Sequence, residues 1–409
     1  MVRFAHIADC HLGAWRDPKL SKLVEEAFVQ VIDRVLAEEV DFVIIAGDLF
    51  NTALPPIDSL KRAVHELERL KQAGIPVYFV AGSHDYSPTG KTMLDVLEEA
   101  SLATNVFQPT SSDDKLSLKP VVDSATGVSL AGILGRAGQL DKELFARLDT
   151  RSLEELSSPK VFVFHAALKE LVSEQISGPD AHSVSLLPTG FDYYAGGHVH
   201  VTEDTSLQGY SRIVYPGPVF PASFSELEDL EQGGFCLVDL EADKVTRVPV
   251  VVREVTRLFL DCTDLAPEEV TRKLVDEITE SVSQKIVLIR VSGRLARGTT
   301  SDIDFREVFA ACTRLGAYTC LKNTRGVSSP QLLLDEEAPV SSAQEIERAV
   351  ISDYAGSVEL SGVEDQESLL HELISVLGSS PGEGETKTSF EDRVVTDALE
   401  LLGVDKPLS

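Results

Sequence analysis

The chain has 409 residues, of which 43% are hydrophobic, so it is long enough for two or three domains with complete cores. Its formal net charge is −29, and residues 331–409 alone hold 18 acidic and 4 basic side chains. This balance weighs against a nucleic-acid partner without excluding one, because metal ions or a local basic surface can still receive a polyanion. No apolar run approaches the roughly 18 residues that span a bilayer, and the five cysteines are scattered without a CxxC pair. We therefore expect a cytoplasmic protein with no membrane segment and no disulfide framework.

The first 200 residues alternate short apolar strands with amphipathic helical patterns. Between the first two strands, Val24, Phe28, Val31 and Val35 recur at helical spacing and form one apolar face. Such a strand–helix order predicts an α/β fold in which helices flank a layered sheet. The last three strands before residue 254 stand too close together for intervening helices, and we expect them to be antiparallel. The expected strands are "VRFAHIAD", "VDFVIIAGD", "PVYFVAG", "VSLAGILG", "KVFVFHA" and "FDYYAGGH", followed by "RIVYPG", "GGFCLVDL" and "KVTRVPV".

A second α/β unit is expected from about Glu254. It has strands at "VTRLFLDC", "KIVLIRVSG" and "YTCLKN", with helices at about residues 267–282 and 305–315 between them. This unit of about 80 residues contains no histidine and no obvious chemistry of its own.

The remainder of the chain is acidic and carries two helical patterns joined by the flexible spacer "GSSPGEGETKTS". Short amphipathic helices on a tether are poorly suited to burying themselves, so we expect this tail to dock on a partner helix. A helical cap on the chain's own body is the alternative. The two apolar stripes are Leu369, Leu370, Leu373, Ile374 and Leu377, and Phe390, Val394, Ala398, Leu401 and Leu402.

Polar side chains of two kinds follow the expected strands at their carboxyl ends. In layered α/β sheets these ends gather ligands from distant parts of the sequence at one rim. Carboxylates and imidazoles together make a mixed oxygen and nitrogen ligand set, which suits Mn, Fe, Zn or Co better than Mg or Ca alone. The candidates are Asp9, His11, Asp48, His84, His165, His198 and His200.

Each of these short motifs is weak by itself. The D-x-H of Asp9 and His11 is commonly an Asx turn, and a histidine that ends an apolar run, such as His165, is commonly a core residue. The H-x-H of His198 and His200 favours a metal site about as often as not. Their combination, each at a strand end and several directly after glycine, predicts a metal centre. Cys10 alternates away from this rim and is expected to pack in the core.

The motifs D-x-H, GD, G-x-HD, a strand-end histidine and GH-x-H, in that order, resemble the calcineurin-like metallophosphoesterase superfamily. The stretches "IADCHLG", "AGDLFNTALPP", "AGSHD", "FHAAL", "GGHVH" and "VYPGP" are similar to the SbcD-type, or meiotic-recombination-eleven, DNA repair nucleases. The resemblance covers residues 1 to about 225. It implies a layered β-sandwich nuclease domain at 1–253, an α/β DNA-capping domain at 254–334, and a tail at 335–409 that binds an SMC-like coiled-coil ATPase.

The resemblance also implies two divalent metal ions, with Mn²⁺ as the usual activator. Asp48 would bridge the two ions. Such a pair, about 3.5–4 Å apart, can generate hydroxide and stabilise charge on the attacking and leaving oxygens of a phosphodiester. The other implied ligands are Asp9, His11 and His200 for the first ion, and His165 and His198 for the second.

Residues 83–85 carry the implied catalytic chemistry. His84 would face the scissile phosphate, steady the transition state and help to protonate the leaving oxygen, while Asp85 would orient His84 through a hydrogen bond. The family has Asn, a ligand of the second metal, at the position of Ser83. Ser83 would reach the ion directly, hold a water that does, or leave the position to solvent.

Three functions are compatible with these residues. The first is a two-metal DNA exonuclease and endonuclease, homodimeric, acting on double-stranded ends and single strands as the nuclease subunit of a double-strand-break repair complex. The second is a metallophosphoesterase for small phosphodiesters or phosphomonoesters, which shares every ligand but needs no appended unit. The third, suggested by Ser83 and the acidic charge, is a scaffold whose site has decayed.

Overall fold

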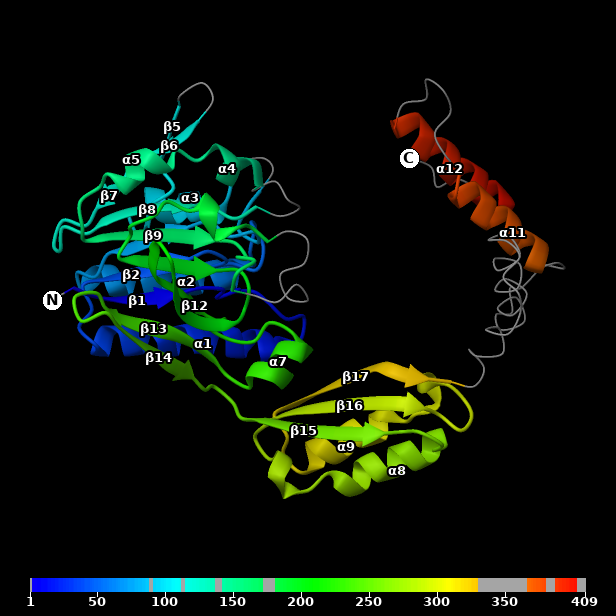
Figure 1. Cartoon of the computed structure of the whole chain (residues 1–409). Coiled ribbons are helices and arrows are strands. Elements are labelled where there is room, and N and C mark those ends of the chain that lie inside the picture. Colours follow the sequence, from blue (N-terminus) through cyan, green and yellow to red (C-terminus); the bar gives the residue numbers. More distant parts are fainter. Residues whose placement is uncertain are drawn as a thin grey trace. The chain divides into compact units, whose positions relative to one another are not determined.

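Two six-stranded sheets form the body of the structure, a computed structural model that describes residues 2–87, 91–111, 115–136, 142–171, 181–329, 366–379 and 387–402 (Figure 1). The first sheet has the order β14-β13-β1-β2-β3-β4, and the second has the order β11-β12-β10-β9-β8-β7. The first comprises β1 (Arg3–Ile7), β2 (Phe42–Ala46), β3 (Val77–Val80), β4 (Thr104–Asn105), β13 (Gly233–Asp239) and β14 (Lys244–Val250). The second comprises β7 (Val121–Val122), β8 (Ser129–Ile133), β9 (Lys160–His165), β10 (Tyr193–Gly197), β11 (Thr202–Leu207) and β12 (Tyr210–Pro216).

The strands in the middle of each sheet are parallel. Strands β1 to β4 pair in parallel, as do β8, β9, β10 and β12, whereas β7, β11, β13 and β14 join antiparallel. Parallel neighbours end on the same edge, so the carboxyl ends of β1, β2 and β3 lie together, as do those of β9 and β10. This topology creates the rim on which the candidate ligands were expected.

The sheets pack face to face, with helices on their outer faces. Residues buried between the sheets include Phe4, Phe42, Val163 and Tyr193. Helices α1 (Pro18–Ala37) and α2 (Ile57–Gln72) pack on the outer face of the first sheet, and α4 (Lys142–Arg147) and α5 (Thr150–Glu154) pack on that of the second. The prediction of an α/β layered β-sandwich is confirmed. Smaller elements are α3 (Met93–Glu99), the hairpin of β5 (Pro109–Ser111) and β6 (Leu116–Leu118), and a 3-10 turn at Val184–Leu186.

The last strands of this body depart from the prediction in two ways. Strands β13 and β14 are antiparallel as expected, but β12 pairs in parallel with β10 in the other sheet. A short helix, α7 (Phe224–Leu230), lies between β12 and β13, where no helix was expected. Because β12 and β13 belong to different sheets, the chain needs a connection between them, and α7 is part of it.

A third sheet of three parallel strands follows, with the order β15-β16-β17. Helices α8 (Pro267–Glu277) and α9 (Phe305–Arg314) cover one face of β15 (Val255–Asp261), β16 (Ile286–Arg294) and β17 (Thr319–Ser328) (Figure 1). On the other face of β16, Ile286 and Leu288 pack into the core that includes α1. The strand–helix order agrees with the sequence pattern, while the expected division into three domains stays a prediction.

By its internal contacts the chain forms two compact units, Met1–Gln331 and Leu332–Ser409. In the second unit the structure describes α11 (Gln366–Leu377) and α12 (Lys387–Leu401), and most of the expected spacer lies outside the described residues. Ile374 and Leu377 of the expected stripe are exposed on α11. Among the described residues, no helix combines the length and the apolar character that crossing a membrane requires.

Candidate metal centre

The predicted site residues lie where the parallel strands end. Asp9 and His11 follow β1, Asp48 follows β2, and Ser83 and His84 follow β3 of the same sheet. In the second sheet His165 is the last residue of β9, and His198 and His200 follow the neighbouring β10.

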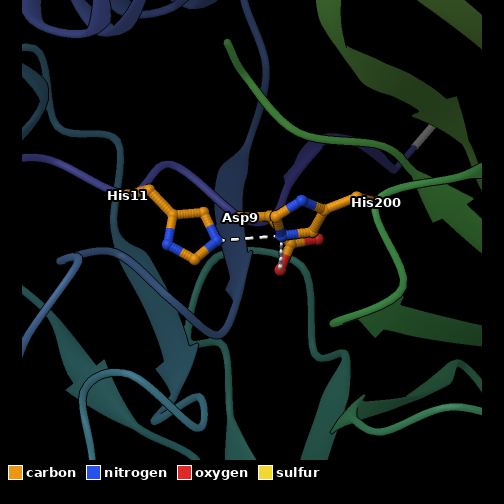
Figure 2. A group of neighbouring side chains, drawn as sticks. All are labelled: Asp9, His11 and His200. Atoms are coloured by element: carbon orange, nitrogen blue, oxygen red, sulfur yellow. Dashed lines mark hydrogen bonds and ion pairs between the residues drawn. The ribbon is translucent and has the colours of Figure 1, made fainter. Parts of the chain in front are cut away.

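The structure brings six of these residues into one cluster. Three groups of ligand atoms, each lying within 4.8 Å of one another, join Asp9 with His11 and His200, His11 with Asp48 and His84, and Asp9 with Asp48 and His165. Figure 2 shows the first group, in which the His11 and His200 rings point toward each other beside the Asp9 carboxylate. Asp9, His11 and Asp48 each belong to two groups, so the three groups form a single centre.

The distances within the centre are short for side chains from remote parts of the chain. Nε2 of His11 and Nε2 of His200 are 2.9 Å apart, and Nε2 of His165 lies 3.2 Å from Oδ2 of Asp48. Oδ2 of Asp48 is also 3.7 Å from Nε2 of His11, and Oδ1 of Asp9 is 3.9 Å from Nε2 of His200.

Burial and mutual attraction set the charges of these groups. Burial raises the pKa of Asp9 and lowers the pKa of His11 to about 3, because both lose solvation in their charged forms. Burial also opposes ionisation of Asp48 and His165, but their attraction outweighs it. The pKa of Asp48 therefore falls below its usual range, and that of His165 rises to about 9. The centre therefore favours an ionised Asp48 with a positive charge beside it, here His165, and a bound cation would supply the same positive charge.

The donor set fits a divalent transition-metal ion. Nε2 of His165 is fully buried and has no hydrogen-bond partner among the described residues, although it faces the Asp48 carboxylate. Nε2 of His11 and Nε2 of His200 lie 2.9 Å apart, so when each neutral ring carries its proton on Nδ1, their two lone pairs converge at one point. Imidazole nitrogens with carboxylate oxygens are the ligands that Mn, Fe, Zn and Co accept.

Three backbone or side-chain acceptors fix the orientation of the imidazoles. His165 Nδ1 lies 2.8 Å from the Ala46 carbonyl oxygen, and His84 Nδ1 lies 2.9 Å from that of Asn51. The His200 Nδ1 lies 3.0 Å from Oε2 of Glu226. When His165 and His200 are neutral, donation from Nδ1–H leaves Nε2 of each ring as a lone pair toward the centre, which is the usual arrangement around ligating histidines.

Glu226 is a residue that the sequence analysis did not find. It lies in the first turn of α7, where Ser223 caps the helix by accepting from the Glu226 backbone N–H at 3.2 Å. The attraction of His200 outweighs burial and lowers the pKa of Glu226 to about 2, while the pKa of His200 rises to about 9. The S-x-x-E spacing of Ser223 and Glu226 is a capping-box signature, and it was the signal available in the sequence.

The role predicted for Asp85 is not what the structure shows. Its buried carboxylate accepts hydrogen bonds from the backbone N–H groups of Leu49 at 3.2 Å, Phe50 at 2.9 Å and Gly82 at 3.1 Å. His84 is oriented by the Asn51 carbonyl instead. Asp85 thus joins the loop after β2 to the loop after β3, and it acts on the site by holding both loops.

Ser83 and His198 lie at the edge of the centre. The Ser83 hydroxyl donates to Oδ2 of Asp48 at 3.4 Å, and the backbone N–H of His84 donates to Oδ1 of Asp48 at 2.8 Å. His198 is exposed and stays outside the three ligand groups found among the described residues. Its ring centroid is 5.1 Å from that of His165, and its backbone N–H donates to Asp9 at 3.0 Å. Both residues keep their predicted roles as expectations.

The backbone at the ligands adopts an uncommon conformation. Asp9, His11, Asp48 and His200 have φ between 46° and 52°, the left-handed region in which Asp and His occur more readily than most non-glycine residues. Gly82, in the turn after β3, is required because space is lacking for a side chain, and its φ is not in the left-handed region. A Cβ on Gly82 would overlap Oδ1 and the backbone nitrogen of Asp48, so only glycine lets the two loops approach this closely.

Comparison with known proteins identifies the family to which this fold belongs. Residues 2–202 match the model of the Calcineurin-like phosphoesterase family. A DNA double-strand break repair protein Mre11 from Archaeoglobus fulgidus is 28% identical over 98% of this chain and 89% of its own length. The Mre11 of Sulfurisphaera tokodaii is 30% identical over 69% of this chain and 71% of its length. The uncharacterized metallophosphoesterase YhaO of Bacillus subtilis is 27% identical over 53% of this chain and 52% of its length.

The β-sandwich with its rim of carboxylates and imidazoles is therefore that of a metal-dependent phosphoester hydrolase. Within that class, the chain belongs to the Mre11, or SbcD-type, family. The resemblance found in the sequence is confirmed.

Proposed function

We propose that the chain is a two-metal DNA nuclease of double-strand-break repair, cutting from ends and within strands. The observation that carries this proposal is the position of Asp48. It lies in one ligand group with His11 and in another with His165, so its carboxylate can serve two ions at once. The alignment with the Mre11 of Archaeoglobus fulgidus covers 98% of the chain and so includes the third sheet, which a small-substrate phosphoesterase does not need.

Two bound ions would polarise the phosphate, lower the pKa of an attacking water and stabilise the developing charge. Asp9, His11, Asp48 and His200 would hold the first, and Asp48, His165 and His198 the second, with Ser83 beside it. Mn²⁺ is the proposed ion, since the mixed nitrogen and oxygen donors accept it.

His84 is placed to act on the substrate. Its ring is exposed at the rim, lies 4.7 Å from the His11 ring between centroids, and is anchored through Nδ1 to the Asn51 carbonyl. As an imidazolium, it keeps the Nδ1 proton in that bond and carries its second proton on Nε2. That proton can pass to the leaving oxygen of the cleaved phosphodiester, a contribution of roughly 10²- to 10⁴-fold in rate.

The decisive experiment compares wild-type protein with His84→Ala. With Mn²⁺, the wild type should degrade linear double-stranded DNA and nick single strands, while His84→Ala should bind Mn²⁺ normally and lose cleavage by roughly 10²-fold or more. Hydrolysis of small phosphodiesters without any cleavage of DNA would replace this proposal with the small-substrate function. A wild-type protein that binds only trace metal would favour a decayed scaffold.

We further propose a homodimer through the groove between α1 and α2. Ile57, which is 75% exposed, lines this groove together with Val64, and Leu54 in the turn before α2 is 70% exposed. Apolar side chains this exposed on one helix and the turn before it favour burial against a second copy. Sedimentation of the wild type should show a dimer, and Ile57→Glu should make it monomeric. A wild-type monomer at micromolar concentration would exclude this interface.

We also propose that the tail at 335–409 binds an SMC-like ATPase subunit. Exposed Ile374 and Leu377 on α11 offer an apolar stripe for a partner helix. A pull-down should compare the full chain with one that ends at Leu334. Equal capture of the ATPase by both would remove this assignment.

A further inference from the structure

Helix α7 lies between the metal centre and the third sheet, and it makes charged contacts with both. On the side of the centre, Oε2 of Glu226 lies 3.0 Å from Nδ1 of His200 and accepts from the Ala222 backbone N–H at 2.9 Å. Its other oxygen, Oε1, accepts from the Ser223 hydroxyl at 3.0 Å. With both carboxylate oxygens held, the position of Glu226 follows that of the helix.

On the opposite side, α7 is tied to β16. Oε1 of Glu228 accepts from Nε of Arg290 at 2.7 Å, and its Oε2 accepts from Nη2 of the same guanidinium. This two-point ion pair is partly buried, with the Glu228 side chain only 13% exposed. The Arg290 guanidinium also lies 5.4 Å from the ring centroid of Phe224, the first residue of α7. Paired and stacked guanidinium groups of this kind fix direction as well as distance.

A second ion pair reinforces the first. Nη2 of Arg257 on β15 lies 2.8 Å from Oε1 of Glu231, the C-cap residue directly after α7. Arg290 lies on the same face of β16 as Ile286 and Leu288, which pack into the main core. Strand β16 therefore packs on the main core through Ile286 and Leu288, and farther along the same face it contacts α7 through Arg290.

Helix α7 has seven residues, which is too short to hold its position by its own hydrogen bonds. Leu227 anchors it in the main core, and the remaining contacts decide how it is turned about that anchor. Because Glu226 and Glu228 are two residues apart on one short helix, a rotation that follows Arg290 also moves the carboxylate that holds His200.

We propose that α7 transmits the position of the third sheet to His200. The placement of this sheet then sets the affinity of the centre for metal. Glu226 is the positioning residue for His200. The Arg290–Glu228 ion pair couples the position of α7 to that of the third sheet. This inference rests on the proposed metal centre. It adds a connection between the third sheet and the site.

The test measures the Mn²⁺ dissociation constant of the metal-free full-length protein by calorimetric titration. Arg290→Gln removes the link without touching the centre, and Glu228→Gln removes it from the helix side in case the first variant does not fold. Arg212→Gln is the matched control, because Arg212 makes an equivalent two-point pair with Asp204, at 2.6 and 2.9 Å, between β11 and β12. Glu226→Ala and Glu226→Gln test the contact with His200 itself.

We expect Arg290→Gln and Glu228→Gln to weaken Mn²⁺ binding roughly 2- to 30-fold. Glu226→Ala should weaken it roughly 10- to 100-fold, the range for groups that orient metal ligands. Glu226→Gln should recover part of this loss, because its amide oxygen can still accept from His200. Exchanging the pair, with Glu228→Arg and Arg290→Glu together, should restore affinity toward that of the wild type, which a merely structural loss would not allow.

Equal Mn²⁺ affinity in Arg290→Gln, Glu228→Gln and Arg212→Gln would overturn the link while leaving the metal centre intact. A wild-type protein that fails to bind Mn²⁺ would overturn the proposed function as well. The two failures are thus distinguished by the wild-type titration alone.

Discussion

Gly82→Ala tests whether the loops after β2 and β3 need a glycine in order to approach each other closely. The added Cβ would overlap Oδ1 and the backbone nitrogen of Asp48, and the backbone nitrogen cannot turn away as the end of a side chain could. Gly82 itself donates to Asp85 at 3.1 Å, which also holds Leu49 and Phe50. The alanine must therefore move the loop after β3, the loop after β2, or both.

The expected cost follows from this overlap. Inserting a methyl group into a closely packed site lowers the free energy of unfolding by about 1–3 kcal/mol. Since the displaced group includes Asp48, Mn²⁺ affinity should fall by roughly 10- to 100-fold as well. The two effects are measured separately, by urea unfolding in the presence of a chelator and by Mn²⁺ titration of the folded protein.

Gly127→Ala is the control for this experiment. Gly127 has φ of 74°, and a Cβ there would meet no described atom within 4 Å. Alanine at this position should lower the free energy of unfolding by about 1–2 kcal/mol through backbone strain alone, with no change in Mn²⁺ affinity. If Gly82→Ala retained both wild-type stability and wild-type Mn²⁺ affinity, the account of why this rim requires glycine would be wrong.

Three further predictions concern the same centre. Ser83→Asn should leave Mn²⁺ affinity and DNA cleavage equal or raise them, because an amide oxygen would reach farther toward the proposed second ion than the hydroxyl beside Asp48; a large loss in either measurement would contradict this. Cys10→Ala should lower the free energy of unfolding by about 1 kcal/mol and leave Mn²⁺ affinity unchanged, since this thiol is fully buried in the core and burial raises its pKa well above the usual range. A strong loss of metal in this variant would instead make Cys10 a ligand. Adding EDTA to protein equilibrated with Mn²⁺ at 100 times its dissociation constant should remove about 2.7 kcal/mol of stability, seen as a lower Tm, whereas an unchanged Tm would mean that the centre binds no ion in the folded state.

The sequence predicts the ligand positions well because strand ends are visible in it. Asp48 directly follows Gly47 after an apolar run, and His165 ends another such run, so the rule that parallel strands gather ligands at their carboxyl ends was sufficient. The structure places Asp9, Asp48, His165 and His200 in one neighbourhood, as that rule requires.

What the sequence does not predict is the layer of groups that orients these ligands. The partner of His84 is a backbone carbonyl, that of Asn51, and a carbonyl carries no residue identity that a motif could reveal. The position of Glu226 is visible only in the capping-box spacing of Ser223 and Glu226, because the short segment between β12 and β13 gives no other sign of a helix. Asp85 was given the wrong partner because a carboxylate next to a histidine in sequence need not face it in space.

The left-handed backbone of the ligands has a consequence for any attempt to engineer this protein. At Asp9, His11, Asp48 and His200, φ lies between 46° and 52°, and glycine would occupy that conformation more comfortably than the native residue. At Asp9 and Asp48, however, glycine would also remove the carboxylates that accept from the backbone N–H groups of His198 and His84. Backbone strain and hydrogen bonding thus act in opposite directions on stability at these positions, and a directed-evolution screen for thermal tolerance must score metal binding as well.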